Sequence, residues 1–96
     1  MYYINNMELS ERYIQTLEKE GFTTVSEWQH GPNEVLVERR HADKVSYLVT
    51  DGSIEFLIDG QSNDVLPGQR VNIPSNTPYS AKVGAGGVIY IMGEME

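Results

Sequence analysis

The chain has 96 residues, with seven Lys and Arg against fourteen Asp and Glu, a formal net charge of −7 and a sequence pI of about 4.7. This length suits one small domain, and the scattered basic residues argue against nucleic acid or a membrane surface as a partner, because both are bound by clustered Lys and Arg. The lack of cysteine excludes a disulfide framework and a thiolate metal site and fits a cytoplasmic protein.

The first part of the chain predicts a short arm and one helix. Residues 1–6 are polar and aromatic and are expected to be extended. The following residues, up to Glu20, place apolar side chains at helical spacing. The members of this stripe are Leu9, Tyr13, Ile14 and Leu17. Gly21 supplies the left-handed residue that ends a helix, and Phe22 is then placed to contact the last member of the stripe. The N-terminus lacks the regions of a signal peptide, and no apolar run reaches the length of a membrane span.

From Phe22 onward, short stretches of alternating polar and apolar residues predict antiparallel strands. The expected strands are residues 22–29, 34–41, 44–50, 53–59, 61–66, 69–73, 79–83 and 88–92. Asp51–Gly52 and Asp59–Gly60 are hairpin signals, and the glycine-rich residues 84–87 predict a further hairpin turn. Strands with a turn about every eight to ten residues favour a small β-barrel or sandwich.

A corner between two predicted strands carries a family resemblance. Gly68 is followed by five residues and then Pro74. Asn76 stands at a position where glycine is usual, and asparagine also tolerates a positive φ. Together with the turn at Gly52, this spacing resembles the two sequence motifs of the cupins, and the similarity extends over about residues 22–94.

The resemblance implies one domain overall. Residues 22–96 would form a small antiparallel β-barrel of the cupin or jelly-roll type, and residues 1–21 would pack against it as an N-terminal arm and helix. The expected fold class is therefore mainly β with one N-terminal α-helix. The small size of the chain and the family resemblance also lead us to expect a homodimer.

The metal ligands of the cupins are mostly missing from this sequence. By the resemblance, the two histidines of the first motif fall on Arg39 and His41. The glutamate of that motif falls on Val45, and the histidine of the second motif falls on Tyr79. Only His41 matches a ligand position, and one imidazole holds a transition metal poorly because such sites need several converging ligands. We therefore expect no metal and no other cofactor.

Strand parity predicts a ligand pocket in place of the metal. Val35 and Val37 alternate with polar residues, and their parity puts Arg39 and His41 on the same interior face. With the residues that the resemblance adds, the expected pocket residues are Val37, Arg39, His41, Val45, Tyr47, Tyr79 and Ala81. A buried guanidinium costs on the order of several kcal/mol unless it is paired. We therefore expect Arg39 to bind an anionic group such as a small carboxylate.

These residues are also compatible with simpler roles. Arg39 fits an extended conformation at the barrel mouth or an ion pair with Asp43. His41 fits a structural hydrogen bond, with no carboxylate assigned beside it, and Tyr79 fits a residue that fills the volume of a lost metal site. His30 lies in a predicted turn and is expected to be exposed.

Three functions are compatible with this sequence. The first, which we favour, is a metal-free barrel that binds a small polar or anionic organic molecule. The second is a cupin enzyme, either a metal-dependent dioxygenase or an isomerase or epimerase that uses a His/Tyr acid–base pair. The third is a degenerate cupin that acts as a dimeric regulatory unit. An open pocket that contains Arg39 favours binding, whereas a filled barrel favours the third function, and the fold alone decides none of them.

Overall fold

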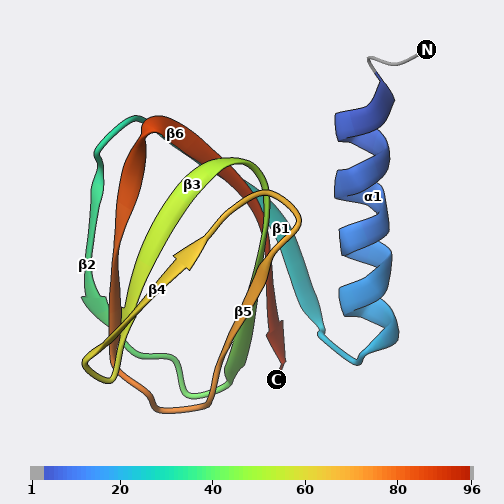
Figure 1. Cartoon of the computed structure of the whole chain (residues 1–96). Coiled ribbons are helices and arrows are strands. Elements are labelled where there is room, and N and C mark those ends of the chain that lie inside the picture. The colour runs from blue at the N-terminus through green and yellow to red at the C-terminus, as the bar shows by residue number, and fades with distance from the viewer. Residues whose placement is uncertain (1–3, 96) are drawn as a thin grey trace.

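The computed structural model describes residues 4–95 as one helix followed by six strands (Figure 1). The elements in chain order are α1 (Ile4–Lys19), β1 (Thr24–His30), β2 (Val35–Arg39), β3 (Lys44–Ile58), β4 (Gln61–Val65), β5 (Arg70–Ile73) and β6 (Tyr79–Met95). The fold class is mainly β with one N-terminal helix, as the sequence predicted. Residues 4–6 belong to α1 and are not extended, and the rest of the predicted arm lies outside the described residues.

The strands form one antiparallel sheet that folds over into two layers. β3 and β6 are long, pair with each other and contribute to both layers. In one layer β6 also pairs with β1 and β3 with β5, and in the other layer β6 pairs with β2 and β3 with β4. Figure 1 shows the resulting roll, in which β3 and β6 run through both layers. This architecture is that of a jelly roll.

The bend of the sheet replaces two predicted hairpins. β3 runs without interruption through Asp51–Gly52, and β6 runs through residues 84–87, so the prediction of hairpin turns at both places is wrong. The β3–β6 register shifts on both sides of Gly52, as expected for β-bulges that bend a pair of strands. Gly52 has a φ of 75°, and a Cβ atom there would lie 2.0 Å from the carbonyl oxygen of Gly87. Glycine is therefore needed at position 52 because β3 and β6 approach each other closely there, and not because the chain reverses.

The turn between β3 and β4 agrees with the sequence. Asp59 and Gly60 have φ values of 48° and 83°, and the flanking residues Ile58 and Gln61 are paired. Two consecutive residues with positive φ are typical of the two-residue turns that match the twist of a hairpin. The predicted hairpin at Asp59–Gly60 is therefore confirmed.

The helix ends as predicted and packs on the outer face of the layer that contains β1. The N–H of Phe22 donates to the carbonyl of Leu17, and the N–H of Gly21 donates to that of Glu18, which is the Schellman arrangement. Leu17 and Phe22 are buried together with Leu48 of β3 and Ile91 of β6. This cluster fixes the C-terminal half of α1 on the sheet.

The main core lies between the two layers. Its buried members are Val45, Tyr47, Val49, Ile54, Phe56, Val65, Ile73, Tyr79, Ala81, Val83, Val88 and Tyr90. The tyrosines bring hydroxyl groups into an otherwise apolar interior, where each hydroxyl needs a hydrogen-bond partner. The placement of these hydroxyl groups therefore defines the polar chemistry of the interior.

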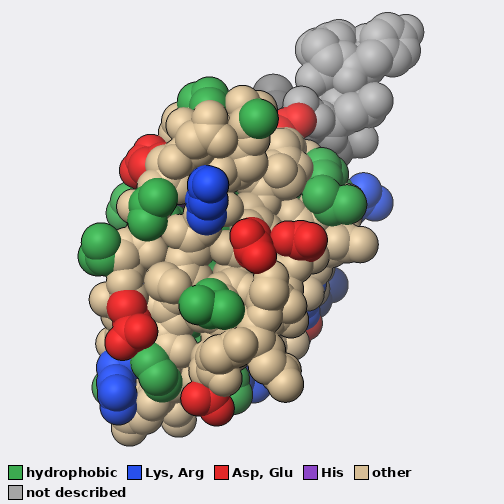
Figure 2. Space-filling model, turned by 60° about the vertical axis from the view of Figure 1, so that its left-hand side comes forward, with side chains coloured by type: hydrophobic (Ala, Val, Ile, Leu, Met, Phe, Trp, Pro, Cys, Tyr) green, Lys and Arg blue, Asp and Glu red, His purple; other side chains and the backbone are tan. Residues whose placement is uncertain are grey.

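The surface is mixed in charge. On the face turned to the viewer in Figure 2, Lys and Arg side chains are separated from one another by acidic, apolar and other residues. No helix within residues 4–95 has the length and apolar character needed to cross a membrane. Large apolar side chains that remain exposed are Trp28, Val35, Val37, Leu57 and Leu66.

Candidate functional site

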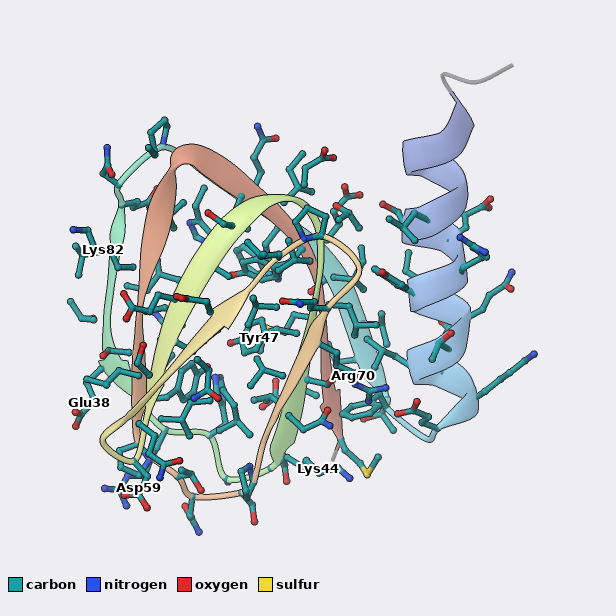
Figure 3. All side chains as sticks on the ribbon, viewed as in Figure 1. Glu38, Lys44, Tyr47, Asp59, Arg70 and Lys82 are labelled. Carbon is teal, nitrogen blue, oxygen red and sulfur yellow. The ribbon has the colours of Figure 1, made fainter. Side chains whose placement is uncertain are left out.

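A small pocket opens between the two layers, at the side formed by the edge strands β1 and β2. Its volume is about 140 Å³. The floor comes from the paired strands β3 and β6, and the rim comes from β1 and β2. The lining residues are Trp28, His30, Leu36, Val37, Arg39, Tyr47, Tyr79, Tyr90 and Met92. Figure 3 shows Tyr47 inside the rolled sheet, whereas Glu38 of β2 points away from it.

One wall of the pocket carries a hydrogen-bonded chain that ends at a carboxylate. The hydroxyl groups of Tyr47 and Tyr79 are 2.6 Å apart, and the Tyr79 hydroxyl is 2.8 Å from Nε2 of His41. Nδ1 of His41 lies 3.3 Å from a carboxylate oxygen of Glu94. No carboxylate was expected beside His41 from the sequence, and this expectation is wrong because Glu94 lies there. We call this set the Glu94–His41–Tyr79–Tyr47 chain.

The corner of the second cupin-like motif holds this chain in place. Asn76 has a φ of 57°, as expected for a residue in a glycine position, and its N–H donates to the carbonyl of His41 at 2.7 Å. Tyr79 then begins β6, and Glu94 lies near the end of the same strand. Because β6 runs through both layers, two residues far apart along one strand meet at His41.

A second chain of the same residue types, with one tyrosine fewer, lies on the β1 side. Nδ1 of His30 is 3.1 Å from Oε2 of Glu34, and Nε2 of His30 is 3.0 Å from the Tyr90 hydroxyl. The other oxygen of Glu34 accepts a hydrogen bond from the N–H of Gly31. The His30 side chain is only 17% exposed, so the expectation of an exposed turn residue is wrong. β1 extends through His30 and directs its ring toward Tyr90.

Burial keeps the pocket hydroxyl groups protonated. Burial and the hydrogen bond to Tyr79 raise the pKa of Tyr47 strongly. Burial also raises the pKa of Tyr79 and raises the pKa of Tyr90 to about 12, while the positive charge of Arg39 opposes part of each increase. At neutral pH all three phenols are therefore protonated.

Arg39 reaches the pocket through an irregularity that the sequence did not predict. Leu36 lies opposite Ala81 and Arg39 lies opposite Tyr79, so β2 carries one residue more than β6 over this interval. The bulge puts Leu36 and Arg39 on the same side of β2. It leaves Val35 64% exposed and Val37 70% exposed. The predicted interior parity of the two valines is therefore wrong. Val37 and Arg39 still line the pocket, at its exposed rim.

The other predicted pocket residues divide into two groups. Tyr47 and Tyr79 line the pocket, and His41 supports it from behind Tyr79. Val45 and Ala81 are buried in the core and are not among the lining residues. The lining residues that the sequence analysis missed are Trp28, His30, Leu36, Tyr90 and Met92.

The residues at the cupin ligand positions do not fit a metal ion. Val45 has no donor atom, and the hydroxyl of Tyr79 is already bonded to Tyr47 and His41. Within the part of the chain that the structure describes, no group of three or more His, Cys, Asp and Glu side chains converges on one point. His41 and Glu94 alone give fewer ligands than transition-metal sites require.

A larger hollow of about 470 Å³ lies elsewhere, on the outside of the bend. Glu55 and Asp64, which are paired across β3 and β4, line it with Lys82. Figure 3 shows Lys82 on the outer side of the roll. Neither histidine and none of the tyrosines of the two chains lines this hollow, so we place the candidate site in the smaller pocket.

The chain matches no protein-family model and no curated protein. Its structure is similar to a cupin superfamily protein from Desulfitobacterium hafniense DCB-2, with a TM-score of 0.67 and 18% identity over 75% of this chain and 66% of that chain. An RmlC-like cupin from Shewanella frigidimarina NCIMB 400 gives a TM-score of 0.69 at 13% identity, over 79% of this chain and 68% of that chain. The DMSP lyase DddQ from Ruegeria pomeroyi DSS-3 gives a TM-score of 0.71 at 18% identity, over 75% of this chain and 37% of that chain.

The similarity covers only part of several of these proteins. For a conserved Streptococcus pyogenes protein of unknown function, with a TM-score of 0.69 and 14% identity, the chain spans 62% of the length. Identities this low concern the fold and leave the activity open. The folded-over antiparallel sheet and these structural neighbours show that the chain has the fold of a small cupin domain.

Proposed function

We propose that the protein binds a small carboxylate, or a similar anionic molecule, in the pocket between β1 and β2. The observation that carries the proposal is the position of Arg39. Its guanidinium lines the pocket, and no carboxylate within the described part of the chain forms an ion pair with it. A guanidinium presents paired donors that match the geometry of a carboxylate.

The surroundings of Arg39 support an anion. The tyrosine hydroxyl groups at the floor are protonated donors, and the pocket lining contains no acidic side chain. The acidic residues of the two chains, Glu34 and Glu94, face the histidines, each at an Nδ1 atom. A carboxylate in the pocket would therefore meet the positive charge of Arg39 and no lining side chain of its own sign.

The volume limits the size of the ligand. At about 30 Å³ per water molecule, 140 Å³ corresponds to about five waters. This is smaller than the usual pockets for drug-sized ligands, which start at about 300 Å³. Leu36, Met92 and the aromatic rings supply apolar walls. A short organic acid with a small apolar part fits these limits.

Calorimetric titration of a series of short organic acids against three proteins tests the proposal. We expect the wild-type protein and Arg40→Gln to bind the same acids. We expect Arg39→Gln to bind them about 10- to 100-fold more weakly, the loss expected for a hydrogen-bonded charge pair. Arg40 is the matched control, since it is exposed and adjacent but does not line the pocket. Equal binding by Arg39→Gln and the wild type would contradict the proposal.

A further inference from the structure

We infer that the pocket does more than bind: it moves a proton to and from the carbon next to the carbonyl of a bound small oxo acid, through a relay of Tyr90, His30 and Glu34. This inference rests on the proposed binding of a carboxylate at Arg39. It assigns a role to His30 and Glu34, which lie outside the residues that the cupin-like motifs contain.

The hydrogen bonds give the relay a direction. The Glu34 carboxylate can only accept, so Nδ1–H of His30 donates to it at 3.1 Å. Nε2 of His30 then carries the lone pair and accepts from the Tyr90 hydroxyl at 3.0 Å. The N–H of Gly31 holds the second oxygen of Glu34 at 3.1 Å. The arrangement of an orienting carboxylate, an imidazole base and a reactive hydroxyl is suited to proton abstraction.

The opposite wall supplies one donor for the charge that develops. If Nδ1–H of His41 donates to Glu94 in the same way, Tyr79 donates to His41 and Tyr47 donates to Tyr79. The Tyr47 ring lies edge-on to the Tyr90 ring at 5.1 Å and 6.0 Å from the Tyr79 ring. The relay and the hydroxyl pair therefore flank the same small volume. Tyr47 stands at the end of its chain, so its one proton can turn from the Tyr79 oxygen to an oxygen anion placed there without breaking a hydrogen bond to a histidine.

The step balances without a co-reactant. The Tyr90 oxygen takes the proton from the substrate carbon as the Tyr90 proton moves to Nε2 of His30. The electron pair of the C–H bond forms the enolate, whose negative oxygen accepts a hydrogen bond from Tyr47 as that hydroxyl turns away from Tyr79. The imidazolium is stabilised by Glu34, and Arg39 offsets the carboxylate of the substrate. Reversal of the step returns a proton to the same carbon, so the net result is exchange of that hydrogen with solvent.

The substrate class follows from these partners. The carboxylate binds Arg39, and the carbonyl oxygen faces the phenol of Tyr47. The carbonyl also makes the neighbouring C–H bond acidic enough for a phenol–imidazole relay. A pocket of about 140 Å³ admits only short acids of this kind.

Proton NMR in deuterium oxide tests the inference with pyruvate and 2-oxobutyrate as probes. The His30 side chain is partly exposed, so its proton exchanges with solvent and the C–H signal of the probe decays. We expect protein-dependent decay that falls about 100-fold in Tyr90→Phe and in His30→Gln, as for other positioned acid–base groups. The melting temperature and the probe affinity of both variants must match those of the wild type, so that a slower decay does not result from unfolding or from lost binding.

Glu34 acts through His30 and is a positioning residue. We expect Glu34→Gln to slow the decay and also to move the pH–rate profile toward lower pH, because the imidazolium loses its anionic partner. A purely structural role would lower the rate without moving the profile. Glu27→Gln is the matched control, since it removes an exposed carboxylate from the outer face of β1 and should leave rate and profile unchanged.

The outcomes separate the two proposals. Calorimetric binding of a probe without protein-dependent exchange overturns the proton-transfer inference and leaves the proposed binding function standing. Exchange that persists at the wild-type rate in both Tyr90→Phe and His30→Gln overturns the relay. If neither probe binds and no other short acid binds either, the proposed function fails and the inference fails with it.

Discussion

Tyr79 is the residue on which the interior hydrogen bonds depend, because its hydroxyl contacts both Tyr47 and His41. Tyr79→Phe leaves the buried Tyr47 hydroxyl without this partner, whereas Tyr47→Phe removes only the end of the chain. We expect Tyr79→Phe to lower the free energy of unfolding by about 1–3 kcal/mol and Tyr47→Phe by about 0.5–1.5 kcal/mol. Urea denaturation of both variants measures this order, and a larger effect of Tyr47→Phe would contradict it.

The sequence predicted part of the site at this scale. Tyr47 and Tyr79 were identified because they lie on strands with regular alternation. His41, which lies beyond the end of β2, was identified because its position resembles that of a histidine in the first cupin motif. Glu94 could not be paired with His41 from the sequence, because their contact depends on β6 passing through both layers. A signal for the second chain was present in the i, i+4 spacing of His30 and Glu34 across a Gly–Pro turn.

Among the elements, the bend in β3 and β6 depends on glycine at one crossing point. Gly52→Ala places a methyl group against the carbonyl of Gly87 and forces alanine to a φ of 75°. We expect a loss of at least about 2 kcal/mol in the free energy of unfolding, since the left-handed conformation alone costs about 1–2 kcal/mol. Gly86→Ala is the matched control: no atom lies within 4 Å of its added Cβ, and a change within about 0.5 kcal/mol is expected. Equal stability of the two variants would rule out the crossing as the reason for Gly52.

The same crossing explains why strand prediction failed here. Asp–Gly at 51–52 has the composition of a hairpin turn, and local composition does not distinguish a turn from a bulge that bends a continuous strand. At Asp59–Gly60 the same dipeptide does form a hairpin, since both residues have positive φ, whereas only Gly52 does at the bend. The difference lies in the partner strand, which the sequence around residue 51 does not contain.

The helix is tied to the sheet by an ion pair that responds to pH. Arg70 donates two hydrogen bonds to the Glu20 carboxylate, at 2.8 and 2.5 Å, and a third to Ser46. The hydrogen bond from Arg70 lowers the pKa of Glu20 below its ordinary value of 4.5. A lowered folded-state pKa contributes stability that is fully present above the unfolded value and is lost as pH falls through the folded value.

We therefore expect wild type to be more stable than Glu20→Gln above pH 4.5, with a difference that shrinks as the pH falls below that value. Guanidinium chloride would screen the pair, so urea denaturation across this pH range is the suitable measurement. Glu18→Gln, on the exposed surface of the same helix, is the control. A difference that stays constant with pH would show that the pair does not stabilise the fold.

For the whole molecule, the sharing of β3 and β6 between both layers predicts a single unfolding transition. Neither layer retains its central strands if the other unfolds, so the two cannot melt separately. Trp28, the one tryptophan of the chain, reports on β1 by fluorescence, and far-ultraviolet circular dichroism reports on the whole sheet. We expect the two urea curves to coincide. Separate midpoints would show that the layers unfold independently.

The homodimer stays a prediction from size and resemblance, and sedimentation velocity at several protein concentrations tests it. The fold class was predictable from alternation, turn residues and the spacing after Gly68, because these are local properties of the sequence. The bulges in β2 and β3 decide which strand faces meet and where the pocket opens, because the alternation of inward and outward side chains shifts by one residue at a bulge.

The floor of the pocket comes from central strands and its rim comes from edge strands, so the residues that keep the domain folded are separate from those that form the pocket opening. Trp28, Val37 and Arg39 at the rim are exposed, so exchanging them removes little buried area. Tyr47 and Tyr79 at the floor are buried and constrained by their neighbours. Substitutions at the rim can therefore change the shape and charge of the pocket opening while the same interior keeps the domain folded.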